Sequence, residues 1–290
     1  MKRFLFILLI FSCNDGFQQQ ATQNIKQVKS LQSTSNIYYW KNGYNISETV
    51  INFVKPPSGF VRIHVQEGSF SDWLRHLPLK EKYAKVHLYN GDLKNNDVHV
   101  AVIDMDVGKK DLQQCADAVM RLRGEYLYSK DKINEIHFNF TNGDNIPFSK
   151  WSSGYKTVVK GNAVSWFREA GNNTSYESFR KYMDNIFMYA GTASLSKELM
   201  PVTIKEMQIG DVLIQGGHPG HAVIVVDMSE NKKSGEKLFL LAQSYMPAQE
   251  MHILKNFNDS QLSPWYNLSE ANESVETPEW TFSKNDLKRF

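Results

Sequence analysis

The pattern of hydrophobic and polar positions changes period along the chain, which predicts strands in some runs and helices in others. Phe60–Val65 alternates as a half-buried strand does, and Val98–Met105 is almost continuously apolar, as in a central strand. Ala222–Met228 and Leu238–Tyr245 are two more strand-like runs. Strands and helices gather in separate runs rather than alternating strictly, which favours an α+β fold.

Two stretches have the period of an amphipathic helix instead. In the first, apolar residues recur at spacings of three and four: Leu112, Cys115, Val119, Leu122 and Tyr126. Asp111 is expected to cap this helix, which places Cys115 near its start and on its buried side. The second helix is expected over Ser175–Tyr189.

The segment Gly210–Asp227 is predicted to form two short buried strands around a glycine-rich turn, with His221 at the start of the second. That second strand is expected to form an antiparallel hairpin with the next apolar run. The hairpin register sets His221 opposite about Tyr245 and one diagonal from Gln243, or beside Ser244 if the register slips by one. In either register a polar side chain stands beside His221.

The first residues have the composition of a secretory signal. Met1–Arg3 is basic, Phe4–Phe11 carries no charge, and Ser12 and Cys13 follow. The apolar run is too short to span a bilayer, and its end resembles a bacterial lipobox with Cys13 as the lipidated residue. We therefore expect a lipoprotein signal peptide over residues 1–13; an ordinary signal cleaved elsewhere is the alternative. The expected location is the bacterial cell envelope, lipid-anchored at the periplasmic or outer-membrane face.

The rest of the chain divides into a tether and a domain. Residues 14–36 are polar and read as a flexible tether. Residues 37–290 are expected to form a single α+β domain, and a chain that is 41% hydrophobic has enough apolar residues for a large core. The formal net charge of +2, with interspersed signs, lacks the basic face of nucleic-acid-binding proteins, so no nucleic-acid partner is expected.

One thiol is left for chemistry in the mature protein. The sequence has two cysteines, so lipidation of Cys13 leaves Cys115 unpaired. A thiol at a helix start is a candidate nucleophile, and His221 is the candidate general base. Gln243 is the candidate orienter of the imidazole; the alternative for Cys115 is a buried structural cysteine.

Other polar residues around this triad have expected supporting roles. Gln113 and Gln114 are candidate donors to an oxyanion hole beside the cysteine. Ser244 and Tyr245 are the neighbours of His221 in the two possible registers. No cofactor is expected.

The segment that contains His221 resembles the corresponding segment of papain-like amidases of the NlpC kind, since Gly210-Asp-Val is followed by Gly220-His and an apolar strand. The resemblance implies a papain-like core in which the helix carrying Cys115 packs on a mainly antiparallel sheet. It also implies the unpermuted order Cys115, His221, Gln243. Where that family usually has Asp-Cys-Ser-Gly, this chain has Gln114-Cys-Ala-Asp117.

A second resemblance spans most of the mature chain. Its motifs are Trp73–Leu79, Asp111–Arg123, Phe138–Thr141, Gln215–His221 and Gln243–Gln249. They are similar to those of an uncharacterised family of bacterial lipoproteins, one of the domains of unknown function. This likeness implies one folding unit and no established activity.

The leading prediction is a lipid-anchored cysteine hydrolase that cleaves amide bonds, with a cell-wall peptide as substrate. Two alternatives stay open. One is a non-catalytic envelope lipoprotein that binds glycan, peptide or a protein partner. The other is a metal-dependent hydrolase that uses His218 and His221 with Asp211 or Asp227. Among the remaining groups, His99 is the reserve base, and Arg121, Arg123 and Glu125 are expected on a solvated helix face.

Overall fold

The centre of the structure is an antiparallel sheet of nine strands within residues 37–290, the part of the chain that the computed structural model describes, apart from the side chain of Asn272. The strand order is β2-β11-β10-β9-β8-β15-β7, and β1 and β12 add to β9 and β10. The signal peptide, the lipobox Cys13 and the tether lie outside the described residues. The strands of this sheet are β1 Val61–Arg62, β2 His99–Val102, β7 Met200–Pro201, β8 Val212–Gln215, β9 His221–Glu230, β10 Lys237–Gln243, β11 His252–Leu254, β12 Tyr266–Asn267 and β15 Leu287–Arg289.

Within residues 37–290, helices pack around this sheet, and three hairpins form separate two-stranded sheets. The helices are α2 Val50–Phe53, α3 Phe70–Arg75, α4 Cys115–Ser129, α5 Phe148–Ser152, α6 Tyr176–Tyr189 and α7 Thr192–Glu198. The hairpins pair β3 His137–Asn139 with β4 Asn145–Pro147, β5 Tyr155–Lys160 with β6 Ala163–Arg168, and β13 Ser274–Glu276 with β14 Thr281–Ser283. Four short 3-10 turns are η1 Ile133–Glu135, η2 Ile204–Glu206, η3 Glu270–Asn272 and η4 Lys284–Asp286.

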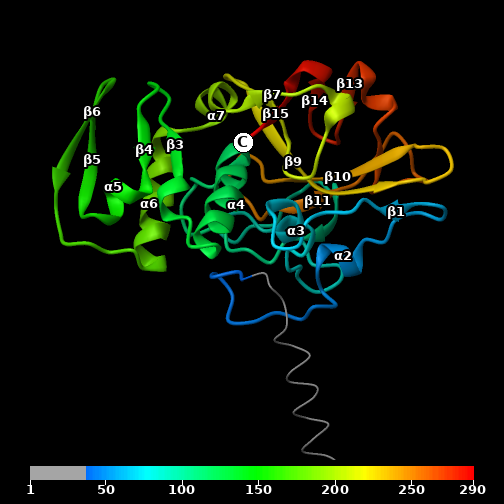
Figure 1. The fold of residues 1–290 in the computed structure, drawn as a ribbon, viewed down its shortest axis with the longest axis horizontal. Helices are drawn as coiled ribbons and strands as arrows, with labels where there is room; N and C mark the ends of the chain where they lie inside the picture. Colours follow the sequence, from blue (N-terminus) through cyan, green and yellow to red (C-terminus); the bar gives the residue numbers. More distant parts are fainter. Residues whose placement is uncertain (1–36) are drawn as a thin grey trace, which may run out of the picture. The chain divides into compact units, whose positions relative to one another are not determined.

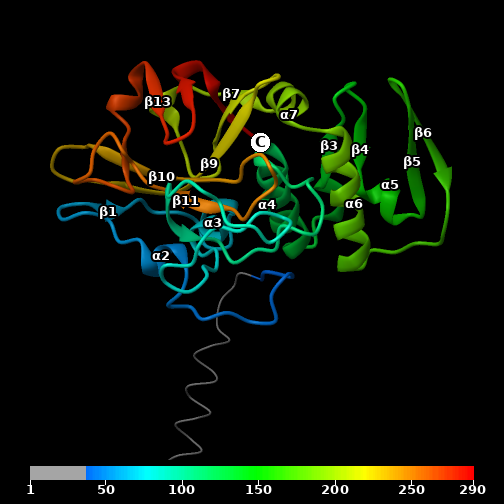
Figure 2. The same ribbon diagram turned by 180° about the vertical axis from the view of Figure 1, so that it is seen from behind.

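Helix α4 lies between the sheet and the group formed by α5, α6 and the hairpins β3–β4 and β5–β6 (Figures 1 and 2). It contacts β9 and β10 on one side and α6 on the other. Gly124 allows the close approach to α6, because a Cβ there would lie 3.2 Å from Phe179 Cζ and 3.3 Å from Met183 Sδ. The first residue of α4 is thereby held against the middle of the sheet.

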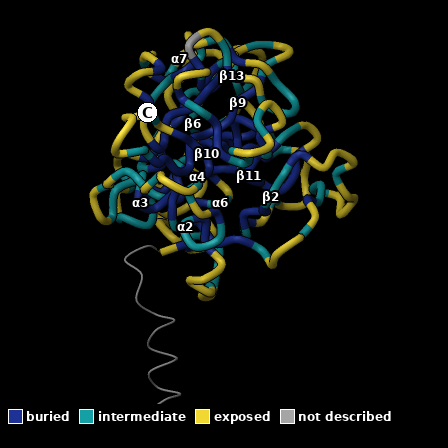
Figure 3. The backbone as a smooth tube through the Cα atoms, turned by 90° about the vertical axis from the view of Figure 1, so that its right-hand side faces the viewer, coloured by how far each residue is buried: buried dark blue, intermediate teal, exposed yellow. Residues whose placement is uncertain are grey.

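The strands in the middle of the sheet are buried on both faces (Figure 3). Every residue of β9 from His221 to Ser229 is buried, and β10 is buried from Leu238 to Gln243. This explains their nearly unbroken apolar sequence, since helices and loops cover both faces. The fold is therefore α+β with a mainly antiparallel sheet, as predicted. No helix in residues 37–290 is long and apolar enough to cross a membrane.

The predicted hairpin register is confirmed next to His221. Leu241 pairs with Val225 and Ala242 with Ile224, after a bulge between Leu240 and Leu241. The prediction for the start of α4 is wrong by one turn. Gln114, not Asp111, is the cap residue, and its backbone N–H donates to Asp117 Oδ2 at 3.0 Å.

The predicted solvated face of α4 is also wrong. Arg121 and Glu125 are 0% and 1% exposed. The Arg121 guanidinium donates to Glu125 Oε1 at 3.3 Å and to Asp106 Oδ2 at 2.5 Å. It also donates to Gln113 Oε1 at 2.7 Å. A buried charge requires such partners. Two of them, Asp106 and Gln113, lie on the loop before α4, which a helical period in the sequence does not reveal.

Candidate functional site

Cys115 is the first residue of α4 and lies on the wall of a cleft. The cleft has a volume of about 400 Å³ and is also lined by the turn from Gly217 to Gly220. Cys115 is 8% exposed. The helix begins here because Asp117 accepts the N–H of Gln114, the reciprocal half of a capping box. The thiol therefore sits where backbone N–H groups of the first helical turn have no helical partner.

The thiol is protonated at neutral pH. Burial, and then the Asp117 carboxylate, raise the pKa of Cys115 to about 11, although the backbone N–H groups of Ala116, Ala222 and Cys115 itself favour the thiolate. A pKa four units above neutrality leaves a thiolate fraction of about 10⁻⁴ at pH 7. Cys115 therefore needs a base to become a nucleophile.

His221 opens β9 and is enclosed by aromatic rings. It pairs with Gln215 of β8 and is 1% exposed. The ring centroids of Tyr245, Trp280 and Phe282 lie 4.8, 5.5 and 5.9 Å from that of His221. Burial lowers the pKa of His221 to about 4, against the opposing effects of Gln243 and Glu279. The imidazole is thus neutral at pH 7, as a general base has to be.

Gln243, the last residue of β10, holds the imidazole. Its Oε1 lies 2.9 Å from His221 Nε2. Its Nε2 donates to Glu279 Oε2 at 2.6 Å and lies 3.4 Å from His252 Nε2. The latter nitrogen is an acceptor, because His252 Nδ1 lies 2.8 Å from the carbonyl oxygen of Glu250 and so carries the proton.

These contacts fix the tautomer of His221. A carboxylate can only accept, so Glu279 takes the amide N–H of Gln243 and turns the amide oxygen toward His221. The imidazole must then donate from Nε2, which leaves Nδ1 as its unprotonated nitrogen. Glu279 is itself held by Lys94 at 2.7 Å. Hydrogen bonds from Lys94, Asn96 and Gln243 outweigh burial and keep the pKa of Glu279 below its usual value.

Cys115 and His221 are linked through two residues, Ala222 and Tyr245, and His221 does not itself line the Cys115 cleft. The backbone N–H of Ala222, the residue after His221, lowers the pKa of the Cys115 thiol. Tyr245 contacts the His221 ring, and burial, Glu279 and Cys115 together raise its pKa. In the described part of the chain no hydrogen bond joins the thiol to the imidazole.

Residues 50–289 match the model of a family described as a domain of unknown function, DUF4846. The chain belongs to this family. No curated protein and no solved structure matches. The predicted likeness to an uncharacterised family is confirmed, and its lipoprotein character stays a prediction. The DUF4846 match includes Cys115, His221, Gln243 and Glu279.

The other predicted supporting residues of the DUF4846 domain do not all lie at the cleft. Gln114 lines the cleft, and its side chain donates to Asp111 Oδ1 at 3.0 Å. Gln113 points elsewhere: its amide oxygen binds Arg121 and its Nε2 donates to the Asp106 carbonyl oxygen at 3.4 Å. The expected donor role of the Gln113 side chain at the thiol is therefore wrong. Ser244 faces away from His221 and donates to the Gln249 carbonyl oxygen at 2.7 Å.

The two aspartates considered for a metal site are engaged elsewhere, and His218 lines the Cys115 cleft. Both oxygens of Asp227 accept from arginines, Arg62 and Arg75, at 2.6 Å. Asp211 pairs with Arg289 at 2.6 Å. No cluster of three or more His, Cys, Asp or Glu within residues 37–290 has the geometry to hold a metal ion. The donor set therefore does not favour the metal-dependent alternative.

Three site residues were missed by sequence reasoning. Glu279 and Lys94 come from loops far apart in the chain, and His252 was assigned only a structural role. His252 is fully buried, and burial lowers its pKa to about 3. His99, the reserve base, lies behind it with ring centroids 5.8 Å apart, and its Nε2 is 3.0 Å from the Ala84 carbonyl oxygen. The one available signal was the pairing of β10 with β11, which sets Gln243 opposite His252.

Proposed function

We propose that this protein is a cysteine hydrolase that cleaves amide bonds. Cys115 is the nucleophile, His221 the general base and Gln243 the residue that orients the imidazole. The observation that carries this proposal is the packing of α4, which begins at Cys115, against β9, which begins at His221, together with the hydrogen bond between the His221 ring and Gln243. A nucleophile, a base and an orienting group make up the catalytic unit of such enzymes.

The reaction begins from two neutral groups. As Sγ attacks the carbonyl carbon, the thiol proton passes to His221 Nδ1, the nitrogen left free by the Gln243 contact. The imidazolium then protonates the leaving amine, and a thioester on Cys115 remains. His221 next takes a proton from water, which attacks the thioester, releases the carboxylic acid and restores the thiol. Catalytic hydrogen bonds often form only when substrate is bound.

Backbone N–H groups supply the charge stabilisation that this reaction needs. Those of Cys115, Ala116 and Ala222 lower the pKa of the Cys115 thiol and so favour negative charge on the sulfur. Preorganised donors of this kind lower the free energy of a tetrahedral oxyanion. Gln114, on the cleft wall, is the side-chain donor nearest in sequence to the nucleophile. Two strands and a helix start thus contribute to one site, which supports a papain-like core.

The location and the substrate are proposals that rest on the sequence. The basic and apolar start of the chain and Cys13 support export and a lipid anchor at the cell envelope. Peptides of the cell wall are the amide substrates available there. The proposed activity is therefore hydrolysis of a cell-wall peptide bond.

The test is a digest of soluble cell-wall peptides followed by mass spectrometry. Wild-type protein should release new amine and carboxyl termini. Cys115→Ala and His221→Ala should lower the rate by about 10³-fold or more. His137→Ala is the matched control, because His137 lies on the separate β3–β4 hairpin and should leave the rate unchanged. Hydrolysis that persists in Cys115→Ala would contradict the proposal.

A binding cleft for peptide or glycan is the second candidate function. It is favoured by the raised pKa of Cys115 and by the lack of a hydrogen bond between thiol and imidazole in the described residues. On this alternative, wild type and Cys115→Ala bind the same cell-wall fragments with equal affinity and neither forms a product. Calorimetric titration of both proteins beside the digest separates the two functions.

A further inference from the structure

A second pocket borders the cleft of Cys115. It has a volume of about 190 Å³ and lies between the loop before α4 and helix α6. Leu112 and Phe187 line both hollows. A group bound in this pocket would therefore lie beside a substrate held in the cleft.

The lining of this pocket is basic. Lys109 and Lys110 come from the loop and Arg180 from α6, against one lining carboxylate, Asp184. The Lys110 ammonium is 3.7 Å from Asp184, and both side chains are largely exposed. Two lysines at the mouth of a pocket raise the local concentration of anions.

The Arg180 guanidinium lies at long ion-pair distances from two carboxylates and leaves one nitrogen without a hydrogen bond. Its Nη1 is buried and has no hydrogen-bond partner. The nearest carboxylate oxygens, on Asp106 and Glu125, are 3.6 and 3.9 Å from its guanidinium nitrogens. Arg121 donates to Asp106 Oδ2 and to Glu125 Oε1, and Tyr176 donates to Glu125 Oε1 at 2.7 Å, while Glu125 Oε2 has no hydrogen-bond partner. A buried N–H left without an acceptor costs free energy, which a bound acceptor would recover.

We propose that this pocket binds a carboxylate of the substrate. The cleft would then accept peptides that carry an acidic group close to the scissile amide bond. The proposal builds on the amide hydrolase function above and names its substrate class. A guanidinium is suited to this ligand because it offers two parallel N–H groups to a carboxylate. Lys109 and Lys110 supply the additional positive charge.

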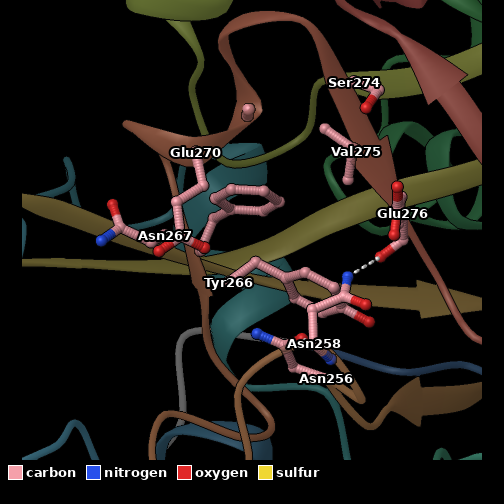
Figure 4. Close-up of a pocket in the computed structure, with 10 residues that line it drawn as sticks. Asn256, Asn258, Tyr266, Asn267, Glu270, Ser274, Val275 and Glu276 are labelled. Atoms are coloured by element: carbon pink, nitrogen blue, oxygen red, sulfur yellow. Dashed lines mark hydrogen bonds between the residues drawn. The ribbon is translucent and has the colours of Figure 1, made fainter.

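The pocket drawn in Figure 4 has the opposite character. It is lined by Asn256, Asn258 and Asn267 and by the carboxylates of Glu270 and Glu276. Its asparagine side chains are used within the protein; Asn258 Nδ2, for example, donates to the Glu276 carbonyl oxygen at 3.1 Å. That pocket offers no basic residue, so it serves as an internal reference for the one at Arg180.

The test is a binding experiment on the full chain that does not depend on catalysis. Glutarate, a dicarboxylate, and glutaramide, its neutral diamide, are titrated while the backbone NMR signals of Gly108, Lys109 and Lys110 are followed. Glutarate should shift these signals to saturation and glutaramide should not. Signals of Asn258 and Glu270 in the reference pocket should stay unchanged with either probe.

Variants identify the groups responsible. Arg180→Gln should weaken glutarate binding by about tenfold or more, and Arg180→Lys by less. The double variant Lys109→Gln/Lys110→Gln concerns exposed residues and should fold even if Arg180→Gln does not; it should weaken binding several-fold. Lys205→Gln/Lys284→Gln, on a different surface, is the charge-matched control and should have no effect.

Three results would overturn the proposal. These are equal shifts with glutaramide, unchanged glutarate affinity in both the Arg180 and the lysine variants, and tighter binding of inorganic phosphate than of glutarate at the same residues. Saturable glutarate binding in a protein that cleaves no cell-wall peptide would leave the pocket assigned and contradict the hydrolase proposal alone. Cleavage that requires Cys115, in a protein that does not bind glutarate, would support the hydrolase proposal and contradict the assignment of the pocket.

Discussion

The two halves of the candidate site differ in how they are held. His221 is fixed on every side: Gln243 binds its Nε2, three aromatic rings enclose it, and Glu279 and His252 fix the Gln243 amide. The position of Cys115 is set by the backbone of its helix. The contact of Asp117 with Gln114 caps that helix, and the buried Arg121 on the same helix anchors it. The proposed base is thus preorganised by side chains, and the proposed nucleophile by the start of a helix.

This difference indicates which half limits the chemistry. The base already has its tautomer and its neutral form, while the thiol is buried with a pKa of about 11. Reactivity therefore depends on whether substrate brings Sγ and Nδ1 into hydrogen-bond contact. Four measurements test this contrast, from the largest expected effect to the smallest.

The pH dependence of stability tests the buried histidines. Burial lowers the pKa of His221 to about 4 and that of His252 to about 3, below the value of about 6.5 for an unfolded chain. Between these pKa values the unfolded state binds more protons than the folded state. The stability that the two neutral histidines contribute to the folded protein is therefore complete above pH 6.5 and is lost as the pH falls toward 4. The loss from both should reach about 5 kcal/mol at pH 4.

Urea unfolding at pH 7, 5.5 and 4 measures this effect. Burial raises the pKa of Asp117, which acts in the opposite direction, so a variant is needed to isolate the histidine contribution. His252→Asn removes one titrating ring and should lose about 2–3 kcal/mol less stability over this range than wild type does. Equal pH slopes in the two proteins would show that His252 is not neutral in the folded state.

Arg121 tests the support of the cysteine half. Arg121→Met leaves the buried carboxylate of Glu125 without its closest cation. We expect the free energy of unfolding to fall by about 3–5 kcal/mol. Arg123→Met is the control. The Arg123 guanidinium lies against aromatic rings, 5.2 Å from the Phe70 centroid, so its loss should lower the free energy of unfolding by about 1 kcal/mol. Similar losses in both variants would contradict a special role for Arg121.

Alanine variants of the two reactive residues compare the halves directly. His221→Ala empties an aromatic enclosure and leaves Gln243 Oε1 without its donor, so unfolding should require about 2–4 kcal/mol less. Cys115→Ala removes one small sulfur at the edge of a cleft and should cost about 1 kcal/mol or less. Differential scanning calorimetry of both proteins is the measurement. A larger loss for Cys115→Ala would reverse the contrast.

Glu279 is the positioning residue with the smallest expected effect. Glu279→Ala frees the Gln243 amide to turn, and we expect kcat to fall by about 10–100-fold with little change in KM. Glu279→Gln keeps an acceptor and should recover part of the rate. The ¹⁵N shifts of the His221 ring report the tautomer independently of turnover. An unchanged tautomer in Glu279→Ala would show that Glu279 does not act through Gln243.

The sequence was informative where contacts are local. The alternation in Gly210–Gln243 was enough to place His221 beside Gln243 and Tyr245, because a hairpin register follows from turn length and side-chain period. The helical period found α4 but misplaced its cap by one turn. Glu279, Lys94 and the Arg121 network join segments far apart in the chain, and no spacing in the sequence encodes such contacts. The papain-like core and the catalytic roles stay predictions.

The position of β9 has a consequence for local opening of the structure. It is paired on both edges, by β8 and β10, and it is buried along almost its whole length. Amide hydrogens of such a strand exchange with solvent only in large-scale unfolding. The loop from Asp106 to Gln114 has no such pairing, and its residues from Asp106 to Asp111 are largely exposed. Opening of that loop alone would expose the start of α4 while β9 stays folded, so the segment that leads into Cys115 and the strand that begins with His221 belong to cooperative units of unequal stability.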